Sequence, residues 1–267
     1  MARKEAMSEE TMLVTVAHPD DETFGCGSLL AHARRMGVRT VVACATRGEA
    51  GSPTPGRGLD DADMGVVREQ ELRDAASFLG VDRVVLYDWF DSDMGGEPGP
   101  GTLCAEPVEA VADAIAATIA EERPTVVVTL DASDGHRDHA HMRDATLLAA
   151  RRAGRPSDRV YLHCLPRTLM AKWVAALRAQ DPDSNYVHLE QLGTPEDLIT
   201  TVIDTADLLS VREGAMALHR SQSSPYEVMA SDLRREFLSA ERLTRVVPPW
   251  AGGSIETEIF SPSDSES

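Results

Sequence analysis

Two short clusters of histidine and aspartate residues have the composition of a metal site. The run from His18 to Glu22 (HPDDE) follows a short apolar segment, and the run from His136 to His139 (HRDH) follows another apolar segment much later in the chain. Two histidines and one carboxylate that leave one position free for water are a typical ligand set of catalytic zinc. The candidate ligands are therefore His18, Asp21 and His139.

The neighbours of these candidate ligands suggest the rest of a hydrolytic site. Side chains of adjacent residues point apart, so Asp20 is free to act as a general base toward the attacking water while Asp21 binds the metal. A protonated His136 would stabilise the oxyanion or protonate the leaving amine. Asp138 is placed to hold one of the histidines in its tautomer. The chemistry that this arrangement predicts is metal-assisted hydrolysis.

Alternating strands and helices would position both clusters. Short Val-rich strands are expected at 12–17, 40–45, 83–87, 125–130 and 160–165, with amphipathic helices at 26–36, 67–79, 108–119 and 138–152. Such alternation predicts a mostly parallel sheet covered on both faces, in a Rossmann-like three-layer α/β fold. Parallel sheets bind ligands at the carboxyl ends of their strands, so the polar clusters that follow the first four strands should converge at one edge.

The chain is expected to form one domain. Residues 11–250 make up this domain, and residues 1–10 and 255–267 are expected to be flexible tails. The part after 165 is expected to be mainly helical, with one possible strand at 186–189.

Composition narrows the class of partner and the compartment. Of the 267 residues 42% are hydrophobic, which is enough for a sizeable core. The net charge of −18 disfavours nucleic acid and anionic membrane as partners and suits a small neutral or cationic substrate. The N-terminus has no apolar segment of a signal peptide, and the four cysteines form no CxxC pair. These features predict a cytoplasmic protein with reduced thiols.

The two clusters resemble the signature of the LmbE-like, or PIG-L, family of zinc-dependent N-acetylglucosaminyl deacetylases. That signature is AHPDDE, present at 17–22, followed by HxDH, present at 136–139. Lesser landmarks are also similar, namely the segments at 46–49, 68–71, 79–80, 90–92 and 219–222. Either main motif alone is a weak signal, whereas the two together are specific. The resemblance covers roughly residues 11–225.

The resemblance implies an LmbE-like fold and removal of the N-acetyl group from an N-acetylglucosamine-type amino sugar conjugate. It implies Zn²⁺ on the three candidate ligands, with Asp20 as base and His136 as electrostatic partner. It further implies that Glu49, Arg68 and Asp91 contact the substrate. Family members of mycothiol synthesis carry a mobile tyrosine two residues before HxDH, where this chain has an aspartate, Asp134.

Other interpretations remain open at this point. The substrate could be a mycothiol-type conjugate cleaved by an amidase, or the chain could be a non-catalytic sugar-binding member of the same fold. The metal could be another divalent ion such as Fe²⁺. An iron oxygenase is disfavoured, because the parallel α/β pattern is not the barrel-like scaffold expected for one. A homo-oligomer is compatible with the sequence, which does not reveal the conjugate's aglycone.

Overall fold

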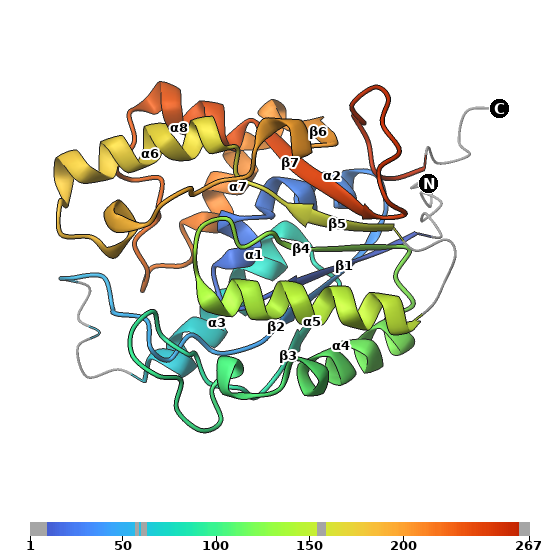
Figure 1. Cartoon of the computed structure of the whole chain (residues 1–267), viewed down its shortest axis with the longest axis horizontal. Helices are drawn as coiled ribbons and strands as arrows, with labels where there is room; N and C mark the ends of the chain where they lie inside the picture. The colour runs from blue at the N-terminus through green and yellow to red at the C-terminus, as the bar shows by residue number, and fades with distance from the viewer. Residues whose placement is uncertain (1–9, 57–58, 60–62, 154–158, 262–267) are drawn as a thin grey trace, which may run out of the picture.

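A seven-stranded sheet forms the centre of the protein (Figure 1). The computed structural model describes residues 10–56, 59, 63–153 and 159–261. The strands are β1 (Thr11–Val16), β2 (Arg39–Cys44), β3 (Arg83–Leu86), β4 (Val126–Leu130), β5 (Arg159–His163), β6 (Thr201–Asp204) and β7 (Ala240–Val247). The α-helices are α1 (Asp21–Phe24), α2 (Gly27–Arg35), α3 (Met64–Leu79), α4 (Val108–Glu122), α5 (Arg137–Ala153), α6 (Arg167–Gln180), α7 (Leu209–Met216) and α8 (Ser231–Leu238).

The order of the strands is β3-β2-β1-β4-β5-β7-β6. The first five strands of the chain pair in parallel, and β7 runs antiparallel to both β5 and β6. This confirms the predicted mostly parallel α/β sheet. The chain winds outward from β1 to β3 and then returns to add β4 on the other side of β1. Because the winding direction reverses between β1 and β4, a crevice is expected at the carboxyl ends of these two strands.

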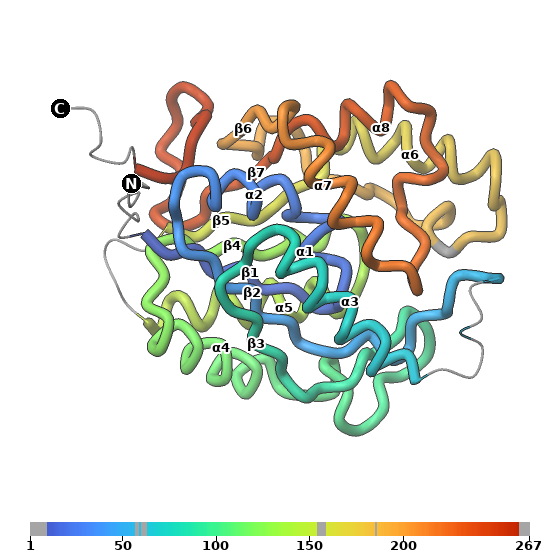
Figure 2. The backbone as a smooth tube through the Cα atoms, turned by 180° about the vertical axis from the view of Figure 1, so that it is seen from behind, coloured from blue at the N-terminus to red at the C-terminus, as the bar shows by residue number. Residues whose placement is uncertain are grey.

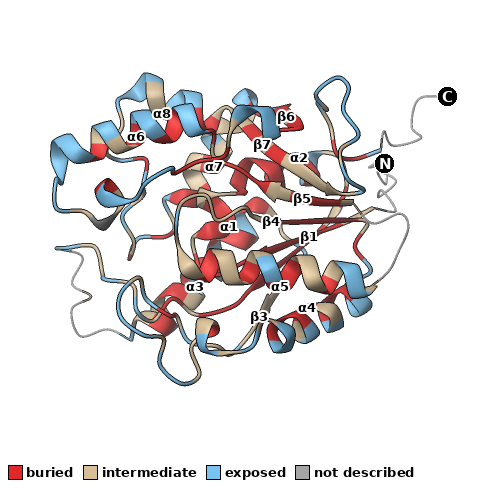
Figure 3. Cartoon of the chain, viewed as in Figure 1, coloured by how far each residue is buried: buried red, intermediate tan, exposed pale blue. Residues whose placement is uncertain are grey.

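Helices cover both faces of the sheet. Alternate residues of β1 belong to different cores, since Met12, Val14 and Val16 pack with α2, α3 and α7, whereas Leu13 packs with α4 and α5. Figures 1 and 2, seen from opposite sides, show these two helical layers. Strands β1, β2 and β4 are buried along nearly their whole length, and Figure 3 shows the buried centre of the sheet. The near-continuous apolar strands follow from burial on both faces.

The C-terminal third differs from the sequence prediction. Two strands, β6 and β7, were not predicted, and the expected strand at 186–189 is instead part of a 3₁₀ helix, Asn185–His188. β7 belongs to the antiparallel end of the sheet, and the side chains of Glu241 and Leu243 are buried there. Its polar composition, AERLTR, hides this role in the sequence.

The prediction of a flexible tail at 255–267 is wrong for residues 255–261, the part of it that the structure describes. Ile259 and Phe260 are 1% and 4% exposed and join the core beside α2. Glu258 accepts a hydrogen bond from His32 at 2.8 Å, which holds the segment against that helix. Residues 255–261 are therefore part of the domain. Among the described residues no helix has the length and apolarity needed to cross a membrane.

A third apolar cluster lies beyond the sheet edge near the carboxyl ends of the strands. It joins α6 and α8 to the 3₁₀ helix Asn185–His188 and to Tyr226. Trp173 of α6 donates a hydrogen bond to the carbonyl of Pro225 at 2.8 Å, which ties α6 to the loop before α8. This cluster forms one wall of the cavity described below.

Candidate metal and active site

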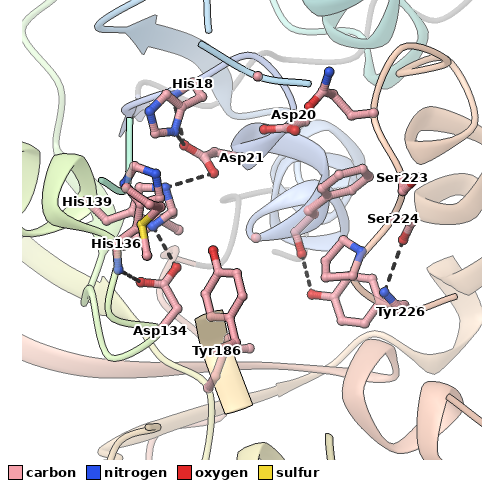
Figure 4. A pocket seen from close by; sticks show the side chains of 18 of the residues that line it. His18, Asp20, Asp21, Asp134, His136, His139, Tyr186, Ser223, Ser224 and Tyr226 are labelled. Atoms are coloured by element: carbon pink, nitrogen blue, oxygen red, sulfur yellow. Dashed lines mark hydrogen bonds and ion pairs between the residues drawn. The ribbon is translucent and has the colours of Figure 1, made fainter. Parts of the chain in front are cut away.

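The fold brings the two histidine clusters together at the switch point. His18 follows β1 directly, and His136 and His139 lie at the start of α5, after the neighbouring strand β4. The ring centroid of His18 is 4.7 Å from that of His136 and 5.3 Å from that of His139 (Figure 4). Nitrogen atoms of these three rings lie within 4.8 Å of one another, as required of groups that hold one metal ion.

His139 presents a free nitrogen to this cluster. Its Nδ1 is 2.6 Å from a carboxylate oxygen of Asp134, so Nδ1 carries the proton and Nε2 is left with a lone pair. Nε2 is buried and has no hydrogen-bond partner among the described residues, although it lies 3.2 Å from Oδ1 of Asp21. The contact is close but does not have the geometry of a hydrogen bond. Two acceptors that face each other in this way fit a shared cation.

Asp21 and His18 are oriented by second partners in the same manner. Oδ2 of Asp21 accepts hydrogen bonds from the backbone amides of Ala17 and His18 at 3.2 and 2.8 Å, which leaves Oδ1 for the cluster. His18 Nε2 lies 3.1 Å from Oδ2 of Asp138, while His18 Nδ1 faces Asp21. Each candidate ligand thus has one atom engaged and one available, the arrangement that orients metal ligands. The residues fit a divalent cation.

The charges of the cluster strongly shift the pKa values of its side chains. Burial lowers the pKa of His139, but the carboxylates of Asp134 and Asp21 outweigh it and raise the pKa to about 10. Burial raises the pKa of Asp21, yet the two histidines beside it hold the pKa well below its usual range. A site that attracts protons so strongly attracts a divalent ion as well, and the two compete.

Asp20 lies beside the ligands in a strained backbone conformation. Its φ is 117°, and its amide donates a hydrogen bond to Oε2 of Glu22 at 2.9 Å. Arg68 holds the same turn, since it donates to the Pro19 carbonyl at 2.6 Å and lies 3.1 Å from the Asp20 carboxylate. A non-glycine residue in this region costs about 1–3 kcal/mol, which typically persists at functional sites. Burial raises the pKa of Asp20 to about 6, although Arg68 lowers it, so the group suits a general base.

A buried histidine, His219, contacts this turn through Glu22. His219 Nε2 is 2.7 Å from Oε1 of Glu22, whose other oxygen binds the Asp20 amide. Both side chains are fully buried. The pair fixes Glu22, and through it the conformation of Asp20.

His136 has a different electrostatic character from the one expected. The backbone amide of Asp138 donates to His136 Nδ1 at 3.2 Å, which places the proton of a neutral ring on Nε2. Burial and the positive charges of His18 and His139 lower the pKa of His136 to about 4. A neutral His136 would offer Nε2–H as a hydrogen-bond donor, whereas the sequence prediction was a protonated group.

The three residues expected to contact substrate have different positions. Asp91 lines the cavity, with a carboxylate oxygen 3.6 Å from Nε2 of His18. Arg68 also lines it, but its guanidinium is buried in the contacts with the Asp20 turn and the Gly48 carbonyl. Glu49 does not line the cavity, and its carboxylate accepts a hydrogen bond from the Asp91 amide at 3.2 Å.

The cluster opens into a cavity of about 640 Å³. One part is lined by the histidines and by acidic side chains, and another by the apolar cluster of α6 and α8. Two features of this cavity were missed by sequence reasoning. Asp134 was considered only as a replacement for a tyrosine, although its place two residues before His136 suits a carboxylate that reaches His139. The apolar wall comes largely from residues 165–186 and 225–237, where no motif indicates a site.

The sheet order and the cluster at its switch point define an α/β protein with a candidate metal site beyond the carboxyl ends of its parallel strands. The chain belongs to the PIG-L family, because the family model described as GlcNAc-PI de-N-acetylase matches residues 13–150. The predicted family and enzyme class are thereby confirmed.

Relatives with related names cover nearly the whole chain. A 1D-myo-inositol 2-acetamido-2-deoxy-alpha-D-glucopyranoside deacetylase of Thermomonospora curvata is 30% identical over 91% of this chain and 92% of its own length. The enzyme of the same name from Thermobifida fusca is 31% identical over 96% of this chain and its full length, 100%. A solved deacetylase of the teicoplanin biosynthesis pathway is 20% identical, covers 88% of this chain and 97% of its own, and superposes with a TM-score of 0.61. At that identity the last likeness supports the fold alone.

Proposed function

We propose that this chain is a Zn²⁺-dependent N-deacetylase that hydrolyses the amide of an N-acetylglucosamine-type amino sugar conjugate. The observation that carries the proposal is the cluster of His18, Asp21 and His139, in which Nε2 of His139 lies 3.2 Å from Oδ1 of Asp21 and Nδ1 of His18 lies 3.5 Å from Oδ2 of Asp21. The names of the curated relatives support an amino sugar as the substrate. Nitrogen and carboxylate ligands in this number are typical of catalytic zinc.

The chemistry follows from the surroundings of each residue. A divalent ion in this cluster would supply Lewis-acid polarisation of the amide carbonyl and lower the pKa of a water molecule. Asp20, with a pKa of about 6, accepts the proton of the attacking water. His136 donates a hydrogen bond from Nε2 to the oxygen that becomes negative. The proton on Asp20 then passes to the leaving nitrogen, which departs as an amine.

The charge of the cavity suits this reaction. Asp91, Asp93, Asp131 and Asp134 line it in addition to the residues of the cluster, and Arg68 is the one arginine in the lining among the residues that the structure describes. An excess of carboxylates favours a neutral substrate and a cationic amine product over a phosphate or carboxylate conjugate. We therefore place the conjugate's aglycone among neutral groups.

The test is amine release from a panel of N-acetylglucosaminyl conjugates by chelator-treated protein with added Zn²⁺, Fe²⁺ or no metal. We expect release only with metal, and a loss of about 10²–10⁴-fold in kcat for Asp20→Asn. The matched control is Asp93→Asn, which removes a cavity carboxylate that no described contact links to the cluster's histidines. Full activity in Asp20→Asn, or no release from any conjugate, would contradict the proposal.

A further inference from the structure

The cavity holds far more apolar surface than an acetyl group can use. Apolar side chains of α6, of α8 and of the loop at 225–229 line one part of it. Those of α6 are Met170, Trp173 and Leu177, whose spacing places them on one face of the helix. They are 3%, 7% and 8% exposed, so this face is shielded from bulk water although it borders empty space.

Aromatic rings also line this part. Tyr186 packs edge-on against Trp173, with ring centroids 5.5 Å apart. Tyr226 packs against Phe237 of α8 and is fixed by a hydrogen bond from its hydroxyl to the Phe24 carbonyl at 2.6 Å. Figure 4 shows Tyr186 and Tyr226 on the side of the cavity away from His18 and Asp20.

The polar residues of the cavity lie elsewhere. Gln222 and Ser223 line it together with Gly51 and Ser52, and Oγ of Ser223 lies 3.3 Å from Oγ of Thr54. Figure 4 shows Ser223 across the cavity from Asp134, whereas Ser224 lies beside Tyr226, whose amide donates to its hydroxyl oxygen at 3.3 Å. Sugar hydroxyls lose water on binding and need such hydrogen-bonding partners, which the apolar part does not offer. The sugar is therefore assigned to the polar wall, and the apolar part is left for the group on the other side of the scissile amide.

We propose that the apolar part of the cavity is an acyl-chain subsite, and that the preferred substrate carries an N-acyl chain longer than acetyl. This rests on the proposed amide hydrolysis and specifies its acyl group. An unfilled apolar space among buried side chains destabilises a fold, whereas an alkyl chain restores the missing contacts. Each methylene that enters should raise kcat/KM about fourfold until the space is filled.

The experiment compares N-acetyl-, N-butanoyl- and N-hexanoylglucosamine methyl glycosides, and in a second arm methyl and hexyl glycosides of N-acetylglucosamine. We expect kcat/KM to rise by at least about tenfold from acetyl to hexanoyl and to change little between the two aglycones. A rise confined to the hexyl glycoside, or no rise with acyl length, overturns the acyl assignment while leaving the deacetylase proposal intact.

A variant whose larger side chain fills the apolar part of the cavity tests the same assignment. Leu177→Trp places extra volume in the apolar part, and Val174→Trp adds slightly more volume on the same helix at a partly buried position that does not line the cavity. The ratio of hexanoyl to acetyl kcat/KM, which does not depend on the folded fraction, should fall about tenfold in Leu177→Trp and stay constant in Val174→Trp. Equal ratios in both variants overturn the proposal.

If no glycoside is hydrolysed, binding still decides the acyl assignment. Calorimetry with metal-free protein should show N-hexanoylglucosamine binding more tightly than N-acetylglucosamine, with a negative heat-capacity change. Equal affinity for the two sugars would overturn the acyl-chain subsite independently of catalysis.

Discussion

Asp134 offers the sharpest test of the metal cluster, because it contacts His139 and is not itself a candidate ligand. Its Oδ2 lies 2.6 Å from His139 Nδ1, and its Oδ1 accepts a hydrogen bond from the His136 amide at 3.1 Å. Loss of such a partner behind a metal-binding histidine typically lowers metal affinity by about 10–100-fold. We expect about tenfold for Asp134→Asn, which keeps an acceptor but loses the charge, and about a hundredfold for Asp134→Ala, which loses both. These changes correspond to about 1.4 and 2.7 kcal/mol of binding free energy.

The assay is competition for Zn²⁺ against a fluorescent chelator, together with activity as a function of free Zn²⁺. Both variants should need more Zn²⁺ for half-maximal activity and should recover most of kcat at saturating metal. Asp93→Asn, another cavity carboxylate, should keep the parent's affinity. Unchanged Zn²⁺ affinity in Asp134→Ala would refute the assigned tautomer of His139, and an activity loss that excess metal does not restore would refute a role through the metal.

Three further predictions concern stability. Arg212→Met should cost about 3–5 kcal/mol in urea unfolding, because it leaves the buried carboxylate of Glu241 without its cation, 3.1 Å away. His219→Gln should destabilise the protein more at pH 6 than at pH 9, because Glu22 raises the pKa of His219 against the effect of burial. Since the folded pKa exceeds the unfolded one, that stabilisation is present at low pH and is lost as pH rises through the folded pKa. Phe260→Ala should cost about 3 kcal/mol, because its ring is buried at 4% exposure.

Each of these has a control or a contrary outcome. Arg35→Met removes an exposed arginine paired with exposed Asp207 and should cost less than about 1 kcal/mol. Phe78→Ala, at a ring that is 54% exposed, should cost clearly less than Phe260→Ala. A His219→Gln penalty that is the same at both pH values would show that the pair does not carry charge.

The histidine and aspartate cluster and the framework that carries it are predictable from local sequence patterns. Apolar strands such as 126–130, each followed by polar residues, indicate buried parallel strands whose carboxyl ends share an edge, because alternation and strand direction are local properties. The pairing of HPDDE with HRDH indicated which side chains meet. Polar strands such as β7 could not be found in this way, since the partners that bury them are set by the whole sheet.

The orientation of the candidate side chains follows instead from contacts between distant parts of the chain. The reversal of winding between β1 and β4 is a property of strand order, which no local pattern encodes. The hydrogen bonds of Asp134 and Asp138, which select the free nitrogens of His139 and His18, depend on loops that pack in three dimensions. The apolar wall from α6 and α8 likewise cannot be told from ordinary core in the sequence. Apolar residues have the same helical spacing whether they line a cavity or pack against other side chains.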